Sequence, residues 1–356
     1  MKKSLLALAV LGTFAGVASA QSSVKLDGTV DLGLQTVKNG SAAGGSQQKS
    51  MINNGINSSQ FRVSGVEDLG GGLKAGFNLN SGVFADTGRS SSENGGKFWN
   101  RRATLSLMGG FGELRLGRDY TPTFWNQTLY DPFGTNGIGT YLGVFGQANL
   151  GTNNTTLVRA DNSIQYWTPA LGGFEAQVMV APNESAAGKS GGKYTGVRVN
   201  FAAGPFSIGA STGSTTVTPA SQADDKLKIS NFAASYKVGP AKLNVQLGQS
   251  KNGNVKEKTS QLGASVALGQ GTINFAYNRI DHSGGVVGSQ FADSADANHV
   301  ALGYTYNLST RTALYGTYAS AKNKGASRYT IGGFSSTGML NDEKSNGLEV
   351  GLRHFF

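Results

Sequence analysis

Apolar and polar residues alternate through most of the chain after residue 21, in segments of about 10 residues. In residues 242–247, Leu and Val occupy one side of an extended backbone, and Lys, Asn and Gln occupy the other. A period of two is that of a β-strand whose two faces meet different surroundings. The chain is therefore predicted to be all-β.

A soluble β-sandwich would also alternate, but three features favour strands that cross a membrane. The apolar side is nearly free of charge, while the other carries Gly, Asn, Gln, Ser, Arg or Lys, which suits lipid outside and water inside. A tilted strand needs about 10 residues to cross a bilayer. Aromatic residues gather near segment ends, as in interfacial girdles: Tyr166, Trp167, Tyr304, Tyr306, Tyr315, Tyr318, Phe355 and Phe356.

Short Gly-rich turns and longer polar stretches separate the segments, which is typical of an outer-membrane barrel with short turns at one end and long loops at the other. The turns lie near residues 70, 110, 171, 204, 239, 269 and 309. The long stretches are 38–56, 85–96, 182–192, 214–226, 251–257, 281–295 and 323–345.

Counting the segments predicts an antiparallel transmembrane β-barrel of 16 strands. An even count is typical of bacterial single-chain barrels, and a barrel of this size encloses an aqueous lumen. The expected function is therefore conduction. The strands are 23–37, 57–69, 72–84, 97–109, 112–119, 159–168, 173–181, 193–202, 205–213, 227–238, 241–250, 258–269, 271–280, 296–308, 311–322 and 346–356.

The first 20 residues have the form of a secretory signal peptide. Lys2 and Lys3 precede an apolar run over residues 5–17, and Ala18 and Ala20 provide the small residues of a cleavage site. The run is too short for a membrane-spanning helix, which needs about 20 apolar residues. We therefore expect residues 1–20 to be removed and residues 21–356 to form one barrel domain in the outer membrane, reached through the periplasm.

The composition limits the chemistry and the kinds of binding partner to be expected of this protein. The 356-residue chain has no cysteine, which excludes a disulfide scaffold and thiol chemistry. Its formal net charge of +10 comes from dispersed residues and not from a dense Lys/Arg block. Nucleic acid is therefore not expected as a partner, whereas small anionic solutes are.

Four stretches resemble the general, non-specific trimeric porins of proteobacteria, of the anion-preferring type. They are residues 68–77, 111–119, 307–315 and 351–356. The resemblance covers essentially the whole mature chain. It implies a homotrimer, a third extracellular loop folded into the lumen, and association with outer-membrane lipid and lipopolysaccharide. It also implies that the terminal Phe356 belongs to the signal read by the outer-membrane assembly machinery.

The resemblance places a constriction loop at residues 120–158, whose one charged residue is Asp131. In the family, arginines on the barrel wall face this loop across the narrowest point of the pore. Gln60 stands where the family often has arginine, which leaves the strength of the anion preference open. The matching arginines are Arg102, Arg118 and Arg159, with Arg101 and Arg62 as further candidates.

Strand alternation refines these positions. Leu105 and Leu107 should face lipid, so Arg102 should point inward and Arg101 outward, unless a bulge changes the parity. Each arginine could instead snorkel at the membrane boundary or pair with Asp119 or Asp161. As a group, the arginines would concentrate anions in a narrow tube. A weak anion preference is the expectation.

Three other functions compete with general conduction. An enzyme is not expected, because no nucleophile motif or metal-ligand spacing appears and His299 near Ser294 is the one conceivable pair. Neither a cofactor nor a metal is expected. A surface adhesin or receptor barrel would bind through its loops, which are of ordinary length. A channel specific for a sugar or an organic anion could use an aromatic slide built from Trp99, Phe124 and Trp125.

Overall fold

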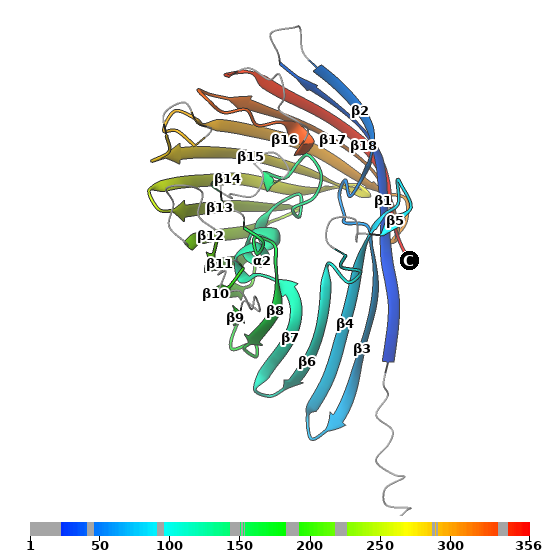
Figure 1. The fold of residues 1–356 in the computed structure, drawn as a ribbon. Coiled ribbons are helices and arrows are strands. Elements are labelled where there is room, and N and C mark those ends of the chain that lie inside the picture. The colour runs from blue at the N-terminus through cyan, green and yellow to red at the C-terminus, as the bar shows by residue number, and fades with distance from the viewer. Residues whose placement is uncertain are drawn as a thin grey trace, which may run out of the picture.

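The computed structural model describes residues 23–40, 46–90, 96–142, 150, 152, 154–182, 192–217, 226–286, 289, 291–333 and 341–356. The expected signal peptide lies outside these ranges. The described chain forms one antiparallel sheet that closes on itself (Figure 1). Its strands are β1 (Ser23–Asn39), β2 (Ser46–Asn53), β3 (Gln60–Gly70), β4 (Leu73–Phe84), β5 (Arg89–Ser90), β6 (Arg102–Gly109), β7 (Gly112–Tyr120), β8 (Arg159–Trp167), β9 (Phe174–Ala181), β10 (Tyr194–Ala203), β11 (Phe206–Thr216), β12 (Lys226–Val238), β13 (Ala241–Asn252), β14 (Val255–Leu268), β15 (Gly271–Ser283), β16 (Ala297–Asn307), β17 (Thr312–Asn323) and β18 (Lys344–Phe355).

Sixteen strand positions make up the wall. β2 and β3 both pair with the same edge of β1, one after the other, so they are two parts of a single wall strand. β5 has two residues and pairs with β4. The other edge of β1 pairs with β18, which closes the ring. Within the described residues the fold is thus a closed 16-stranded antiparallel barrel, and this prediction is confirmed.

Three predicted loops contain more strand than expected. β2 lies in the predicted loop 38–56, and β5 lies in the predicted loop 85–96. The predicted loop 251–257 is mostly strand, because β13 and β14 are joined by a tight turn in which Gly253 has a φ of 59°. The sequence prediction ended each strand where its apolar side ended. Backbone pairing does not need apolar side chains, so the ladders continue past the apolar band.

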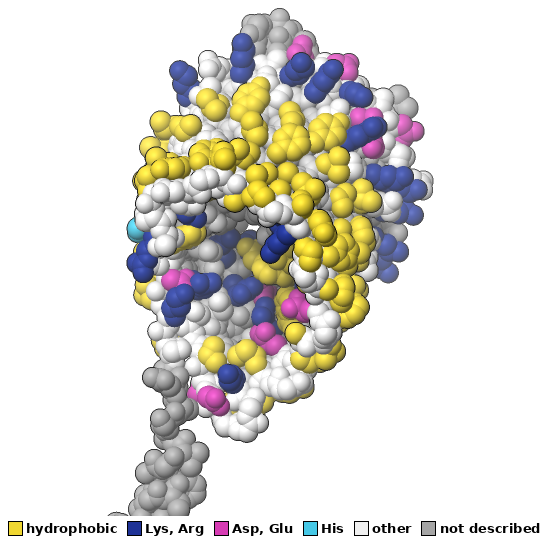
Figure 2. Space-filling view, turned by 180° about the vertical axis from the view of Figure 1, so that it is seen from behind, with side chains coloured by type: hydrophobic (Ala, Val, Ile, Leu, Met, Phe, Trp, Pro, Cys, Tyr) yellow, Lys and Arg dark blue, Asp and Glu magenta, His cyan; other side chains and the backbone are white. Residues whose placement is uncertain are grey.

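The two faces of the wall differ as predicted. On β6, Leu105 and Leu107 are 60% and 39% exposed, whereas the intervening Thr104 and Ser106 are buried against the interior. Figure 2 shows apolar side chains spread over the outer surface, while the hollow displays charged and polar groups. This sidedness is what lipid outside and water inside require.

No helix in the described part of the chain is long and apolar enough to cross a membrane.

Helix α2 (Pro122–Tyr130) lies inside the barrel, immediately after β7 (Figure 1). The Thr121 side chain caps the helix by accepting a hydrogen bond from the Phe124 N–H, and Pro122 occupies the first turn, where no backbone donor is lost. A second short helix, η2 (Ile331–Gly333), follows β17. The prediction that the loop after β7 folds inward is confirmed for its described residues, although the helix within it was not foreseen.

Interior side chains hold this loop against the far wall. Asn126 donates to the Asn231 side chain at 2.7 Å, and the Tyr130 hydroxyl donates to Asn200 at 2.7 Å. At two places where the loop approaches the wall, the wall residue is a glycine. A Cβ on Gly209 would lie 2.3 Å from Oδ1 of Asn126, and one on Gly263 would lie 2.4 Å from Cγ of Pro132. The interior of β11 and β14 is therefore shaped for this loop.

Candidate pore constriction

A cavity of about 590 Å³ lies in the lumen between α2 and the wall of β3, β4, β6 and β8. The charged side chains on its lining are those of Arg62, Arg101, Arg102 and Arg159. Among the residues that the structure describes, no aspartate or glutamate lines it. The cavity is thus a polar, cationic space beside the inward-folded loop.

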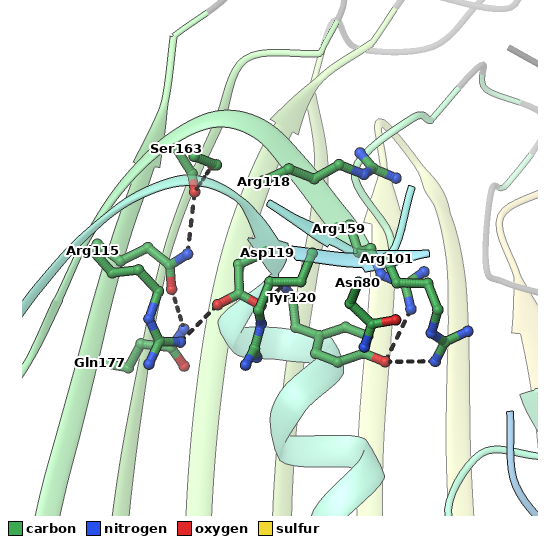
Figure 3. A network of polar contacts seen from close by, with 12 residues as sticks. Asn80, Arg101, Arg115, Arg118, Asp119, Tyr120, Arg159, Ser163 and Gln177 are labelled. Carbon is green, nitrogen blue, oxygen red and sulfur yellow. Dashed lines mark hydrogen bonds and ion pairs between the residues drawn. The ribbon is translucent and has the colours of Figure 1, made fainter. Parts of the chain in front are cut away.

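The phenol of Tyr120, the last residue of β7, is part of the cavity lining. Nη2 of Arg101 donates to its oxygen at 3.1 Å, and Nη2 of Arg159 donates to the same oxygen at 2.9 Å (Figure 3). The Arg159 guanidinium also lies 4.5 Å from the centroid of the Tyr120 ring. Phe124 and Trp125 stack near Tyr120, with ring centroids 5.1 and 5.8 Å away. Two cations therefore converge on one phenolic oxygen that is held in place by aromatic packing.

Arg101 points into the lumen, so the prediction that strand parity turns it outward is wrong. β6 begins at Arg102, and Arg101 lies in the bend before it, where alternation does not apply. The backbone N–H of Arg101 donates to the carbonyl of Asn80, and its Nε donates to Oε1 of Gln60 at 3.1 Å. Gln60 also lines the cavity and accepts from the Asn80 side chain at 2.9 Å.

The remaining two lining arginines are paired with acids. Nε of Arg102 lies 2.7 Å from Oδ1 of Asp119, whose side chain is 1% exposed. Arg115 binds the other oxygen of Asp119 at 2.7 Å and also pairs with Glu113 at 2.8 Å. A neighbouring pair joins two interior residues: Arg62 holds Asp27 through Nε and Nη2, each at 2.8 Å. These contacts neutralise much of the charge of Arg102 and Arg62.

Arg118 does not line the cavity, which corrects its predicted place. It stands directly opposite Ala103, on the same face as Leu105 and Leu116, and opposed residues of an antiparallel pair share a face. Its Nη1 binds Oδ1 of Asp161 at 2.6 Å, and in Figure 3 its guanidinium lies apart from the group around Tyr120. Arg118 does come just before the loop in the sequence, as predicted. Its side chain, however, lies on the outer face of the wall.

Asp131 does not present its charge to the cavity either. It is 7% exposed and accepts hydrogen bonds from the backbone N–H groups of Phe133 and Thr135, each at 3.1 Å. The Thr140 hydroxyl and the Gln261 amide donate to it at 2.5 and 3.5 Å. Burial raises the pKa of Asp131 above its usual value, although these donors oppose the shift. Asp131 thus organises the loop rather than facing the arginines.

Other residues singled out from the sequence fall in separate places. Phe124 and Trp125 line the cavity, but Trp99 packs with Phe61 and Phe98 and is not part of the lining. His299 is fully buried, and its ring nitrogens lie 2.9 Å from the Asn278 amide and 3.1 Å from the Ile138 carbonyl. These contacts tie the inward loop to β15 and β16.

Tyr120, Arg115 and Asp27 were missed as site residues, whereas Asp119 had been named as a possible partner of an arginine and is one. Alternation with Leu114 and Leu116 could have placed Arg115 inward. Nothing in the sequence marks Tyr120 and Asp27, because their roles depend on which side chains the closed barrel brings together.

A closed barrel with an apolar exterior, a polar interior and an inward-folded loop beside an arginine-lined cavity defines an outer-membrane channel. Comparison with known proteins makes this specific. A family model described as Gram-negative porin matches residues 7–326. The chain belongs to this family and is an outer-membrane porin.

Its relatives match over their full length. The chain is 40% identical over 369 residues to outer membrane porin protein 32 of Delftia acidovorans and 31% identical over 413 residues to an outer membrane porin protein of Bordetella pertussis, covering 100% of both chains in each case. The solved structure of an anion-selective porin from Comamonas acidovorans is 35% identical, with a TM-score of 0.81 over 94% of this chain and 100% of that one.

Proposed function

We propose that this porin passes small hydrophilic solutes and ions by passive diffusion, with a weak preference for anions. The observation that carries the proposal is the shared contact of Arg101 and Arg159 with Tyr120. Both guanidinium groups line the cavity, and among the described residues no carboxylate pairs with either of them. The constriction is proposed to lie here, between the loop 120–158 and the opposite wall.

The physical basis is the field of fixed cations in a narrow space. A guanidinium stays charged at any physiological pH. In a tube whose walls have a low dielectric constant, such charges raise the local concentration of anions and lower that of cations. The anion selectivity of the solved relative from Comamonas acidovorans supports the same sign of preference in this chain.

The preference is proposed to be weak because half of the lining arginines are compensated. Arg102 is paired with Asp119, and Arg62 with Asp27, which Lys25 also contacts at 2.9 Å, so the two carboxylates offset part of the charge of these arginines. Gln60 contributes a neutral amide at a third position. The potential therefore depends mainly on Arg101 and Arg159.

General diffusion is favoured over a sugar-specific channel by the arrangement of the aromatic rings. Phe124 and Trp125 pack on Tyr120 within one cluster, while Trp99 lies outside the lining. A slide that guides a sugar needs a run of rings along the path. We further propose that the protein carries out no catalysis.

Several properties implied by family membership are also proposed for this chain: cleavage of residues 1–20, assembly as a homotrimer, association with lipopolysaccharide, and recognition of Phe356 by the assembly machinery. The position of Phe356 is compatible with a role at the barrel seam. Its N–H donates to the carbonyl of Gly28 at 3.1 Å, and its carbonyl accepts from the Gly28 N–H at 3.2 Å.

Reversal potentials in planar bilayers test the selectivity. Purified protein is inserted between KCl solutions of unequal concentration, and the voltage at zero current is measured. We expect stepwise conductance and a reversal potential whose sign indicates greater chloride permeability. A potential of the cation-preferring sign would overturn the proposal. Protein unfolded by heat before insertion provides the control and should give no steps.

A further inference from the structure

The imidazole of His282 is buried at the end of the barrel that carries the long loops. His282 lies near the end of β15 and is 3% exposed. Its Nδ1 lies 2.6 Å from the carbonyl oxygen of Ala295, in the loop before β16. Its Nε2 lies 3.3 Å from Oε2 of Glu257, the residue directly opposite on β14, and 3.2 Å from the hydroxyl of Tyr329, in the segment after β17. One imidazole thus bridges two neighbouring strands and two loops.

This ring lies beyond the apolar band of the wall. At its height the residues that alternate to the outer face are charged: Lys256 and Lys258 on β14, and Arg279 and Asp281 on β15. Asp281 lies directly opposite Lys258 and pairs with Arg279 at 2.7 Å. Charged side chains on the outer face indicate a height outside the hydrocarbon of the membrane. The group around His282 therefore belongs to the mouth of the barrel and not to its membrane-spanning part.

The contacts of the ring fix how many protons it shares with Glu257. A carbonyl oxygen only accepts, so Nδ1 must carry a proton. If the imidazole were neutral and Glu257 ionised, Nε2 would direct a lone pair at a carboxylate. The contact with Oε2 therefore needs one more proton, either on Nε2 or on the carboxyl group. The Tyr329 hydroxyl can donate or accept, so it fits both forms.

Acids and phenols face this group from the elements packed against it: Glu257 on β14, Asp293 and Asp296 in the loop before β16, Tyr329 after β17, and Tyr141 of the inward loop, which lines a small cavity with Glu257. The carboxylate of Asp296 accepts a hydrogen bond from the His282 backbone N–H at 3.4 Å. The lysines and arginines nearest to the ring on these elements stand on the outer face or are exposed: Lys256, Lys258, Arg279, Lys324 and Arg328. The surroundings therefore favour a positive charge on the imidazole.

The extra proton is accordingly held at neutral pH. Burial alone would lower the pKa of His282, but its contacts with Glu257 and with the Ala295 carbonyl outweigh burial and raise the pKa above its usual value. Burial raises the pKa of Glu257 as well, although His282 opposes that shift. A raised pKa of His282 means that its contacts stabilise the docked loops fully below the usual histidine pKa of about 6.5. This stabilisation is lost as the pH rises through the raised value.

Loss of the shared proton breaks one of two contacts. If Nδ1 keeps its proton, the Nε2 lone pair faces the Glu257 carboxylate. If the proton moves to Nε2, the Nδ1 lone pair faces the Ala295 carbonyl, 2.6 Å away. The two loops are also joined to each other, because the backbone N–H of Lys324 donates to the carbonyl of Asp296 at 2.9 Å. Release of one loop therefore loosens the other.

We propose that His282 and Glu257 form a proton-dependent latch, which holds residues 291–296 and 324–331 on the mouth of the barrel and releases them as the pH rises above neutral. Phe291 packs on the imidazole, with the ring centroids 5.6 Å apart, and so moves with the loop. The latch lies apart from the arginines that line the cavity, so it adds a pH response that passive diffusion does not require.

Spin labels at single cysteines test the latch, because the chain has no cysteine of its own. Arg328→Cys places a label beside Tyr329, at an exposed position of the latched segment. Lys49→Cys places the matched control label at an exposed position of β2, toward the same end of the barrel. The mobility of each label is recorded by electron paramagnetic resonance in the purified porin in detergent, from about pH 5 to about pH 9.

We expect the label at residue 328 to become mobile as the pH rises. The ratio of mobile to immobile label should change about tenfold or more, as the loss of a buried hydrogen bond between charged groups implies. The label at residue 49 should not respond. A label at residue 328 whose mobility is the same at every pH would overturn the proposal, and so would equal responses at the two sites.

Two substitutions in the Arg328→Cys chain should act in opposite directions. In Glu257→Gln the amide donates to Nε2 of a neutral imidazole, so the segment should stay immobile up to about pH 9. In His282→Phe neither contact can form, so the segment should be mobile at every pH. A pH response that persists in either variant contradicts the latch, as does release of the segment at every pH in Glu257→Gln.

Nitrogen-15 NMR of the histidine rings keeps the proposal testable if neither variant folds. In the unchanged porin, His282 is expected to lose a ring proton with a midpoint above about pH 6.5, at the same pH at which the label at residue 328 becomes mobile. A midpoint at or below that value, or one that does not coincide with the change in mobility, would overturn the proposal.

Discussion

Arg101 and Arg159 both donate a hydrogen bond to the phenolic oxygen of Tyr120. Tyr120 is the residue at which the inward-folded loop leaves the barrel wall. Arg101 comes from the bend before β6 and Arg159 from the start of β8. The phenol is not a carboxylate, so it positions both guanidinium groups without forming an ion pair with either. We therefore propose that the anion preference of this porin depends on two residues that are far apart in sequence and share one acceptor.

Replacing Arg118 by Ser is expected to leave selectivity unchanged, because its side chain lies on the outer face of the wall beside Asp161. Arg102→Ser is the matched comparison and should lower the ratio of chloride to potassium permeability about twofold. A unit charge some 8 Å from the permeating ion contributes about 0.5 kcal/mol in water. Reversal potentials of the two variants provide the measurement. A loss of selectivity in Arg118→Ser would show that its place on the outer face is wrong.

Asp119→Asn is expected to increase anion preference about twofold by the same Coulomb estimate, because it removes the carboxylate that compensates Arg102. It should also destabilise the barrel by about 3 kcal/mol, since Arg102 and Arg115 both lose a buried partner. Asp161→Asn removes an equivalent but half-exposed partner of Arg118 and serves as control. Bilayer recordings and thermal unfolding distinguish them. If Asp119→Asn and Asp161→Asn changed selectivity and stability to the same extent, the burial of Asp119 would be contradicted.

Gly263→Ala tests whether the wall is shaped for the loop. A Cβ at this position would lie 2.4 Å from Cγ of Pro132, so the loop must shift. We expect a destabilisation of about 1–3 kcal/mol and a changed single-channel conductance. Gly316→Ala is the control, because the nearest atom to its Cβ would lie 3.7 Å away. If both variants conduct like the unchanged porin, the position of the loop does not depend on the close approach of Pro132 to Gly263.

Asp131 should make docking of the loop sensitive to pH. Burial raises its pKa, so its contribution to stability is fully present below the ordinary carboxyl pKa and is lost as the pH rises through the raised value. Asp131→Asn cannot titrate. The melting temperature of the unchanged porin minus that of the variant should therefore be larger, by roughly 2 °C or more, at about pH 4 than at about pH 7.5. A difference that does not vary with pH would contradict the raised pKa.

Most of the barrel was predictable because each strand carries its own signal. The alternation around Leu105 and Leu243 reports which side meets lipid, and this does not depend on distant residues. The failures occurred where the backbone pairs without an apolar side. Residues 46–50 and 256–257 are polar on both faces, so no local pattern separates strand from loop, although the ladder extends through both.

The site was less predictable because it depends on single residues at strand ends. Arg101 escapes the parity rule by lying one residue before β6, whereas Arg118 obeys it and points away from the lumen. The role of Asp131 was misjudged because a lone carboxylate in a loop says nothing about the donors that surround it once the loop closes on itself. Tyr120 was missed for the same reason.

The double variant Arg101→Ser and Arg159→Ser shows whether these two arginines are the source of the anion preference. Its reversal potential is measured in a KCl gradient beside that of the unchanged porin. We expect anion preference to be lost or reversed while stepwise conductance remains, since the two charges that have no acidic partner among the described residues have been removed. An anion preference as large as that of the unchanged porin would show that the selectivity arises elsewhere.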